Sequence, residues 1–360
     1  MAYANISKPS LHMNSVLYTG NGSTQSITGV GFQPDLNWIK CRSASENHNW
    51  SDSVRGDSGL NTGYYYIMSN NTDQSSSGAG NTLVSALNAD GFSIGNNDQV
   101  NANTATFVSW NWKAGTTTGI TQGGAAITPS AYSFNQTAGF SIIKYSGTLT
   151  GSGSTTVPHG LGVAPKMIIF KLLSGADNWA VQNTNLTAGY YMQLNTTIAQ
   201  TDATGDGALA APTSDLFSLN WKGEWGNSGS DYIAYCFADV KGYSKCGQIE
   251  GNLNADGPFV YTGFKPAFLL LKNADNSASG DEWFMEDAAR STYNPTGKKL
   301  SANLNNSETT GSWVDIDFLS NGFKIRTSDA GLNEHTMIYM AFASEPLVAN
   351  VGNSIPATAR

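Results

Sequence analysis

The sequence predicts an all-β chain of three tandem antiparallel β-sandwiches, of the jelly-roll or lectin-like kind, with extended terminal arms. Three observations lead to this prediction. One pattern is repeated three times along the 360 residues. Short runs of β-branched and aromatic residues recur throughout, separated by Gly- and Asn-rich turns. Charged residues make up only 13% of the chain, which is typical of rigid β proteins with short polar turns.

The repeated pattern is an apolar run that follows Gly-x-x-Pro and ends at a lysine, then a lone tryptophan, and much later an aromatic-rich closing strand. The runs, tryptophans, pre-closing aromatics and closing strands are 31–40, Trp50, Phe92 and 107–112; 162–171, Trp179, Phe217 and 232–237; and 263–272, Trp283, Phe323 and 337–342. A unit of about 100 to 130 residues has the size of a domain, not of a solenoid repeat. The chain is therefore expected to contain three copies of one fold.

The pattern and the local composition divide the chain into six segments. We expect an N-terminal arm at 1–14, sandwiches at 15–115, 130–240 and 241–346, a linker at 116–129 and a C-terminal tail at 347–360. Helical signals are confined to Glu286–Arg290, which predicts one short surface turn. Terminal arms of this kind are often ordered by a neighbouring subunit.

Charge and apolar content exclude several classes of partner. The net charge of -8, from 27 acidic and 19 basic residues, argues against a nucleic-acid surface, which needs clustered Lys and Arg. The apolar runs are far shorter than the roughly 20 residues that cross a bilayer, so no membrane insertion is expected. The N-terminus lacks the pattern of a secretory signal. Free thiols are expected at Cys41, Cys236 and Cys246, with a bridge between Cys236 and Cys246 as the alternative.

A catalytic centre is not expected. Glycosidases need two carboxylates a few ångström apart, and the candidate acids are Glu282, Glu286 and Asp287, with Asp315 and Asp317 as a second group. No acid pair recurs between the repeats, so loop-capping or surface roles are favoured. No nucleophile elbow is present and the four histidines occupy unrelated positions. We therefore expect no enzyme activity, no metal and no cofactor.

The candidate binding residues lie in loops that are not repeated. Trp221 and Trp225, in a Gly-rich segment, are candidates for a surface contact or for stacking against a glycan. Asp202 and Asp206 form a candidate cation loop, although a solvated loop is the favoured interpretation because the remaining ligands of a calcium loop are absent. The recurring Trp38, Trp110 and Trp283 are expected in cores.

Several blocks resemble a family of tailed-bacteriophage structural proteins. The family is common among phages of marine bacteria and is often labelled tail fibre or virion structural protein. The blocks that carry the resemblance are 15–25, 29–40, 108–115, 159–169, 256–266, 339–343 and the Ala-Thr-Ala-Arg terminus. The resemblance covers nearly the whole chain and implies a place in a virion, without a set of catalytic residues.

The favoured hypothesis is a non-enzymatic protein on the virion surface, made in the bacterial cytoplasm, that forms part of the tail fibre or host-attachment apparatus. A capsid decoration protein is the alternative, and a glycan-binding or glycan-degrading protein is a second one. The expected partners are other virion proteins, a host-surface glycan and further copies of the chain, with a trimer favoured. Three domains of one chain can replace three subunits only if they pack around an axis, and the sequence leaves that open.

Overall fold

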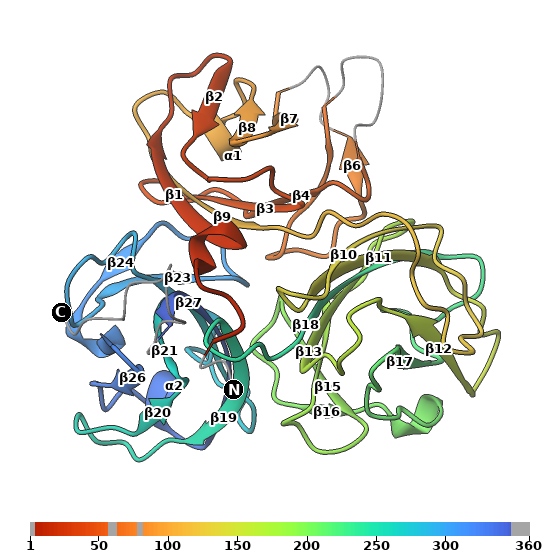
Figure 1. Ribbon diagram of the computed structural model, residues 1–360. Helices are drawn as coiled ribbons and strands as arrows, with labels where there is room; N and C mark the ends of the chain where they lie inside the picture. Colours follow the sequence, from red (N-terminus) through yellow and green to blue (C-terminus); the bar gives the residue numbers. More distant parts are fainter. Residues whose placement is uncertain (1–3, 57–62, 78–81, 347–360) are drawn as a thin grey trace.

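The computed structural model describes residues 4–56, 63–77 and 82–346, and it is all-β, as predicted. Six antiparallel sheets pair into three sandwiches, each with one large sheet of six or seven strands and one small sheet of two or three. The sandwiches lie side by side around a common centre (Figure 1).

The first sandwich has a large sheet in the order β1-β9-β3-β4-β5-β6 and a small sheet in the order β2-β8-β7. The bounds of its elements, in chain order, are η1 (Pro9–Leu11), β1 (Met13–Thr19), β2 (Gln25–Thr28), β3 (Leu36–Cys41), β4 (Asn49–Asp52), β5 (Tyr65–Ile67), β6 (Ser76–Ser77), β7 (Val84–Asn88), β8 (Gly91–Ile94), α1 (Asp98–Asn101) and β9 (Thr106–Trp112).

The second sandwich adds an edge strand to its large sheet, in the order β10-β11-β18-β13-β14-β15-β16, and pairs β12 with β17 in the small one. The bounds are β10 (Ala131–Asn135), β11 (Phe140–Ser146), β12 (Ser154–Pro158), β13 (Met167–Leu172), β14 (Ala180–Asn183), β15 (Tyr190–Gln193), β16 (Thr201–Asp202), η3 (Thr204–Asp206), β17 (Leu216–Asn220) and β18 (Asp231–Phe237).

The third sandwich repeats the topology of the first, with sheets in the orders β19-β27-β21-β22-β23-β24 and β20-β26-β25. The bounds are β19 (Ser244–Glu250), β20 (Phe259–Tyr261), β21 (Phe264–Asn273), β22 (Phe284–Asp287), β23 (Lys298–Ser301), β24 (Thr309–Thr310), η4 (Ser312–Val314), β25 (Ile316–Leu319), β26 (Gly322–Ile325), α2 (Ala330–Asn333) and β27 (Thr336–Pro346).

The three large sheets face one another across a shared axis. One hydrophobic core draws side chains from all three sandwiches. At its centre the last aromatic residues of the closing strands, Trp112, Phe237 and Phe342, form a triangle with ring-centroid distances of 6.2, 5.7 and 6.0 Å. The chain is thus a covalent assembly with pseudo-threefold symmetry, which answers the question the sequence leaves open.

The central strands of each large sheet are buried on both faces. One face packs on the shared core and the other on the small sheet of its own sandwich, where three further cores lie. All six residues of β3 are buried, and β13 and β21 are buried almost throughout. A strand with two buried faces reads as a continuous apolar run and not as an alternation, which explains the unbroken runs in the repeated pattern.

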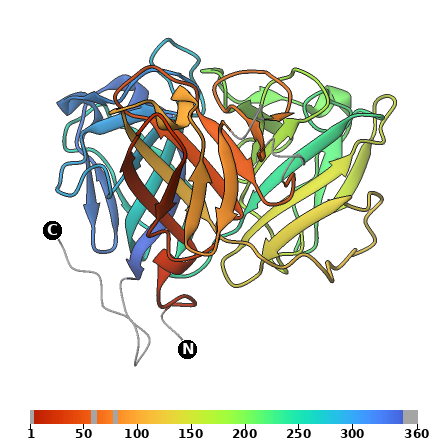
Figure 2. The same ribbon diagram turned by 90° about the horizontal axis from the view of Figure 1, so that it is seen from above.

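The two ends of the described chain meet at one end of the axis. The Asn5 amide donates to the Lys241 carbonyl (3.0 Å), and Gly242 packs against both Ala4 and Pro346. Figure 2 shows the start of the chain and the end of β27 on the same side of the molecule. The arm is ordered by its own chain, since Ala4 and Ile6 are buried. The expected tail at 347–360 lies outside the described residues.

The short helical elements differ from the sequence prediction. Glu286 and Asp287 end strand β22, and only the next residues form a turn. The cross-strand pairing of Glu286 with Leu269 overrides the weak helical signal. Short helices form instead at α1 and α2, where Asn97 and Asp329 accept a backbone hydrogen bond as N-caps. Cys41, Cys236 and Cys246 are buried free thiols.

Candidate functional site

The repeated lysines lock the sandwiches together. Lys40, Lys171 and Lys272 occupy the same position, one residue beyond the last β4, β14 or β22 pairing of their strand. Each ammonium crosses to the preceding sandwich around the axis and donates to a loop carbonyl, of Asn305 (3.1 Å), Thr72 (2.9 Å) and Thr197 (3.1 Å) respectively. Burial lowers the pKa of all three lysines to about 8. The lysine of the sequence pattern is therefore a contact between sandwiches.

In addition to the three lysine contacts, a ring of three hydrogen bonds joins each sandwich to the preceding one around the axis. Trp179 Nε1 donates to the Met68 carbonyl (2.8 Å) and Trp283 Nε1 to the Gln193 carbonyl (2.9 Å), each in the preceding sandwich. In the first sandwich His48 takes this role, because its Nε2 lies 3.0 Å from the Ser301 carbonyl.

The partners of the His48 ring determine its tautomer. Trp38 donates its indole N–H to His48 Nδ1 (2.8 Å), so Nε2 carries the proton and donates like an indole nitrogen. Burial, with the nearby Lys40 ammonium as a lesser cause, holds the pKa of His48 well below its usual range. The imidazole is therefore neutral.

Strand register corrects the alignment of the tryptophans. Trp50 pairs with Trp38, as Val181 pairs with Ile169 and Met285 with Leu270. The structural counterparts of Trp50 are thus Val181 and Met285. His48 is the counterpart of both Trp179 and Trp283. Trp38, Trp110 and Trp283 are buried as expected, but in the core shared by all three sandwiches.

A buried ion pair follows strand β4 and another follows β22. Asp52 binds Arg55 and also accepts the Tyr235 hydroxyl of the second sandwich (2.7 Å). At the equivalent place Asp287 binds Arg290 and accepts Trp110 Nε1 of the first sandwich (3.0 Å). Both pairs are almost fully buried, and each arginine also donates to a backbone carbonyl, of Trp50 or Met285. The acids thus orient side chains across two of the three seams between sandwiches.

At the third seam, between the second and third sandwiches, a neutral turn stands in place of the ion pair. Asn183 stands where the other repeats have aspartate, and Leu186 where they have arginine. Asn183 Oδ1 caps the following turn through the Asn185 amide (2.9 Å), and no described residue accepts a hydrogen bond from its buried Nδ2. Met340 occupies the strand position of Tyr235 and Trp110, and its thioether has no hydrogen to donate across this seam.

The candidate acids therefore have structural surroundings. Asp287 is neutralised by Arg290, and Glu282 accepts a hydrogen bond from Asn303. Glu286 points into the third sandwich, where no hydrogen bond of normal geometry from a described residue reaches its carboxylate. Burial raises the pKa of Glu286 well above its usual range, so the group is held protonated. Asp315 and Asp317 lie near the exposed Arg326, which pairs with Asp317 at 3.6 Å.

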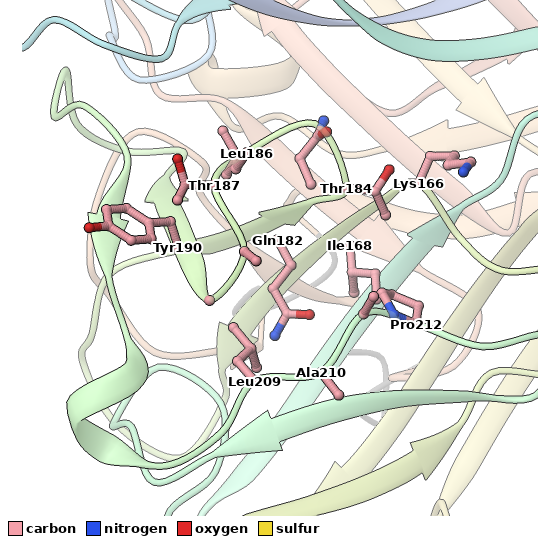
Figure 3. A pocket seen from close by; sticks show the side chains of 14 residues that line it. Lys166, Ile168, Gln182, Thr184, Leu186, Thr187, Tyr190, Leu209, Ala210 and Pro212 are labelled. Carbon is pink, nitrogen blue, oxygen red and sulfur yellow. The ribbon is translucent and has the colours of Figure 1, made fainter.

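A small pocket opens in the second sandwich beside this neutral turn. Its volume is about 150 Å³. Figure 3 shows Gln182 pointing its amide between Leu209 on one side and Ile168 with the adjacent Pro212 on the other. Gln182 Nε2 donates to the Ser218 carbonyl (3.3 Å), which leaves its carbonyl oxygen as the acceptor facing the pocket. The cavity can take a small apolar group that carries one hydrogen-bond donor.

The pocket follows from the residues that distinguish this repeat. Gln182 is the counterpart of Glu286, and Leu186, on the pocket wall, is the counterpart of the two buried arginines. Sequence reasoning missed the pocket because neither residue is unusual in isolation. The signal that could have found it is the change from Asp and Arg to Asn and Leu at one repeated position.

A family described as "Domain of unknown function (DUF7483)" matches residues 8–346, which contain all three sandwiches. The chain belongs to the DUF7483 family. No curated protein matches the sequence.

The DUF7483 fold brings together the two unrepeated loops that the sequence singles out. The Trp221 amide donates to the Asp206 carbonyl (3.1 Å), and Lys222 forms an ion pair with Asp206 (2.9 Å). Asp202 Oδ1 accepts the Thr204 amide in a local turn (2.7 Å). Among the described residues no group of three or more His, Cys, Asp or Glu side chains could hold a metal ion. Both carboxylates already serve the loop itself.

The two tryptophans of this loop have different surroundings. Trp221 is 39% exposed, whereas Trp225 is fully buried against Phe170 and Tyr191. Trp225 Nε1 donates to Asn220 Oδ1 (2.8 Å). Only Trp221 therefore presents its ring to a partner.

No helix in the described ranges is long and apolar enough to span a membrane.

Proposed function

We propose that this DUF7483 protein is a non-catalytic structural component of a tailed-bacteriophage particle, exposed on the particle surface and serving host attachment. The family resemblance of the sequence blocks supports a place in a virion. The observation that carries the proposal is the shared axis, because one core and three seams join the sandwiches into a covalent pseudo-trimer. Virion parts are symmetric assemblies, and a chain with internal threefold symmetry fits a threefold position with a single copy.

The position of the chain ends supports an anchored arrangement. The first described residues and Pro346 meet at one end of the axis. Attachment through that end leaves the opposite end and the flanks of the sandwiches free to face the host. A homotrimer is the alternative arrangement, and light scattering separates it from a monomer of 38.1 kDa.

The acids in the sequence support a structural role. Asp52 and Asp287 hold arginines and seam contacts, and Glu286 is enclosed and protonated. A glycosidase needs a carboxylate pair that reaches its substrate. None of these three groups is exposed to a substrate, since each is at least 98% buried.

Imaging of particles with antibody against the chain tests the proposal. The expected result is label at the tail or its fibres in particles of the encoding phage. Label in lysate fractions only, with none on purified particles, contradicts a virion role. An isolated chain that releases oligosaccharide from host polysaccharide contradicts the non-catalytic part.

A capsid decoration protein is the second candidate. The compact threefold outline, with both ends of the described residues on one side, favours it, because such a body can sit on a threefold position of a head with that side toward the shell. The same images decide, since label over the whole head and label at the tail are distinct patterns.

A further inference from the structure

The outer face of the third small sheet carries two exposed aromatic side chains. Phe259 and Tyr261 are 46% and 57% exposed and lie on the same side of β20, two residues apart. Between them Val260 points inward and pairs with Phe323 in the core. Figure 1 shows β20 at the outside of the molecule, away from the axis. Side chains at this spacing stand about 7 Å apart along one strand.

The other two repeats provide an internal control. Their inward pairs at this place are Ile27 with Phe92 and Val157 with Phe217, which fixes the equivalence. The residues that flank these pairs are small or aliphatic: the exposed Ser26 and Thr28 in the first sandwich, and the half-buried Thr156 and buried Pro158 in the second. The fold therefore does not require aromatic residues at this place, and their presence in one repeat calls for another reason.

The charges beside the aromatic pair are already neutralised. Lys324, the cross-strand neighbour of Phe259, pairs with Asp256 at 2.8 Å. Just beyond the end of β26, Arg326 pairs with Asp317 of the neighbouring strand β25 at 3.6 Å. A face whose cations each have an acidic partner is complementary to an uncharged ligand, while polar groups around the rings remain available for hydrogen bonds.

The size of the patch argues for a small ligand. Two aromatic side chains that are about half exposed present on the order of 200 Å², whereas a stable protein interface buries about 800 Å² per partner. The negative faces of aromatic rings attract weakly positive C–H groups, which line the flat faces of sugar rings. Polar rims around apolar rings suit the hydroxyl groups of the same ligand.

We propose that the Phe259–Tyr261 face binds a neutral polysaccharide, whose sugar rings stack on the two aromatic side chains. Such binding is a property of the isolated chain, so it is independent of a place in a phage particle. Its failure leaves the proposed virion role untouched, and absence from virions leaves the binding untouched.

The test is affinity electrophoresis of the full chain in native gels that contain one polysaccharide each. Dextran, laminarin, soluble starch and galactomannan are the neutral probes, and alginate is the acidic comparison. We expect retardation in at least one neutral gel and none in alginate. The double variant Phe259→Ser/Tyr261→Thr, which carries the residues of the first repeat, should weaken that binding about tenfold or more. Leu17→Ala is the control, an exposed apolar side chain on the first sandwich that should leave binding unchanged.

Several results would overturn the inference. These are free migration in all four neutral gels, stronger retardation in alginate, or equal retardation of the double variant. Self-association that is lost in the double variant would identify the face as a contact between copies instead. Because both substitutions replace exposed side chains with residues that the same fold already accepts, an unchanged melting temperature is expected and excludes misfolding as the cause of lost binding.

Discussion

The turn after β14 and the turn after β22 occupy the same place in two repeats but use opposite chemistry. The third sandwich has Glu286, Asp287 and Arg290, and the second has Gln182, Asn183 and Leu186. One set encloses an ion pair and a protonated acid, whereas the other is neutral and lies beside a pocket.

The difference shows what the fold requires at this place. The fold needs a turn at the end of the strand and a side chain that packs behind this turn. The buried arginine of the ion pair and the leucine of the neutral turn are two ways to provide that side chain. Burying two charges removes them from water, which offsets most of their mutual attraction. Once one charge is present, however, its partner becomes indispensable.

The largest effect is expected from breaking the ion pair on one side. Arg290→Leu leaves the Asp287 carboxylate buried without its cation, and we expect the free energy of unfolding to fall by about 3–5 kcal/mol. Urea denaturation measures it. Arg326→Leu, at an exposed pair, is the control and should cost no more than about 1 kcal/mol. Equal losses in the two variants would contradict the role assigned to the buried pair.

The raised pKa of Glu286 predicts that the free energy of unfolding of the wild type falls as the pH rises. Because the pKa of Glu286 is raised in the folded state, that state keeps a proton that the unfolded chain loses above its ordinary pKa of 4.5. Stability contributed by this group is therefore present below pH 4.5 and is lost as pH rises, by up to about 1.4 kcal/mol per pH unit.

Glu286→Gln, which installs the residue of the second repeat, should remove that loss. We expect the variant to be more stable than the wild type at pH 7 and equal to it near pH 4, as measured by urea denaturation at both values. Glu250→Gln on the surface is the control. A variant that is less stable at pH 7 would show that the carboxylate is ionised and stabilising in the folded protein.

Where the repeats agree, the effects of substitution should agree as well. Lys40→Met, Lys171→Met and Lys272→Met each remove one ammonium that joins two sandwiches, and each should cost about 1–3 kcal/mol. Thermal denaturation of the three variants provides the comparison. A loss confined to one of them would mean that the seams are not equivalent at the lysines.

The smallest effect is expected from converting one turn into the other. Asp287→Asn combined with Arg290→Leu gives the third sandwich the neutral turn of the second. We expect a loss below about 1.5 kcal/mol, much smaller than that of Arg290→Leu alone, because no unpaired charge remains. If the double variant is as unstable as the single one, the arginine contributes through packing and backbone contacts, and the comparison of the two turns fails.

The sequence predicted the repeated sandwiches but not their arrangement. The apolar run at 36–41 shows no alternation because both faces of β3 are buried, yet a run alone does not say whether the second face meets a small sheet or another sandwich. The repeated lysines were visible, whereas their acceptors lie in loops of a different repeat.

The candidate site was predicted only in part. His48 replaces Trp179 and Trp283 in the ring of hydrogen bonds because an imidazole and an indole both offer an N–H, an equivalence that spacing cannot reveal. Trp221 and Trp225 are four residues apart, but only the first is exposed, since Trp225 fills the core beneath the loop. The exposure of Phe259 and Tyr261 could not be predicted without the register of β20, which places Val260 inward and its two neighbours outward.

The central claim is that three sandwiches form one unit around a shared core. Differential scanning calorimetry of the full chain tests it most directly, because a single cooperative unit gives equal calorimetric and van't Hoff enthalpies. We predict one transition with a ratio of the two enthalpies near one for the wild type, and for Arg290→Leu one transition at lower temperature. Three separable transitions, with only one of them shifted by Arg290→Leu, would show three independent domains on a string and would contradict the account.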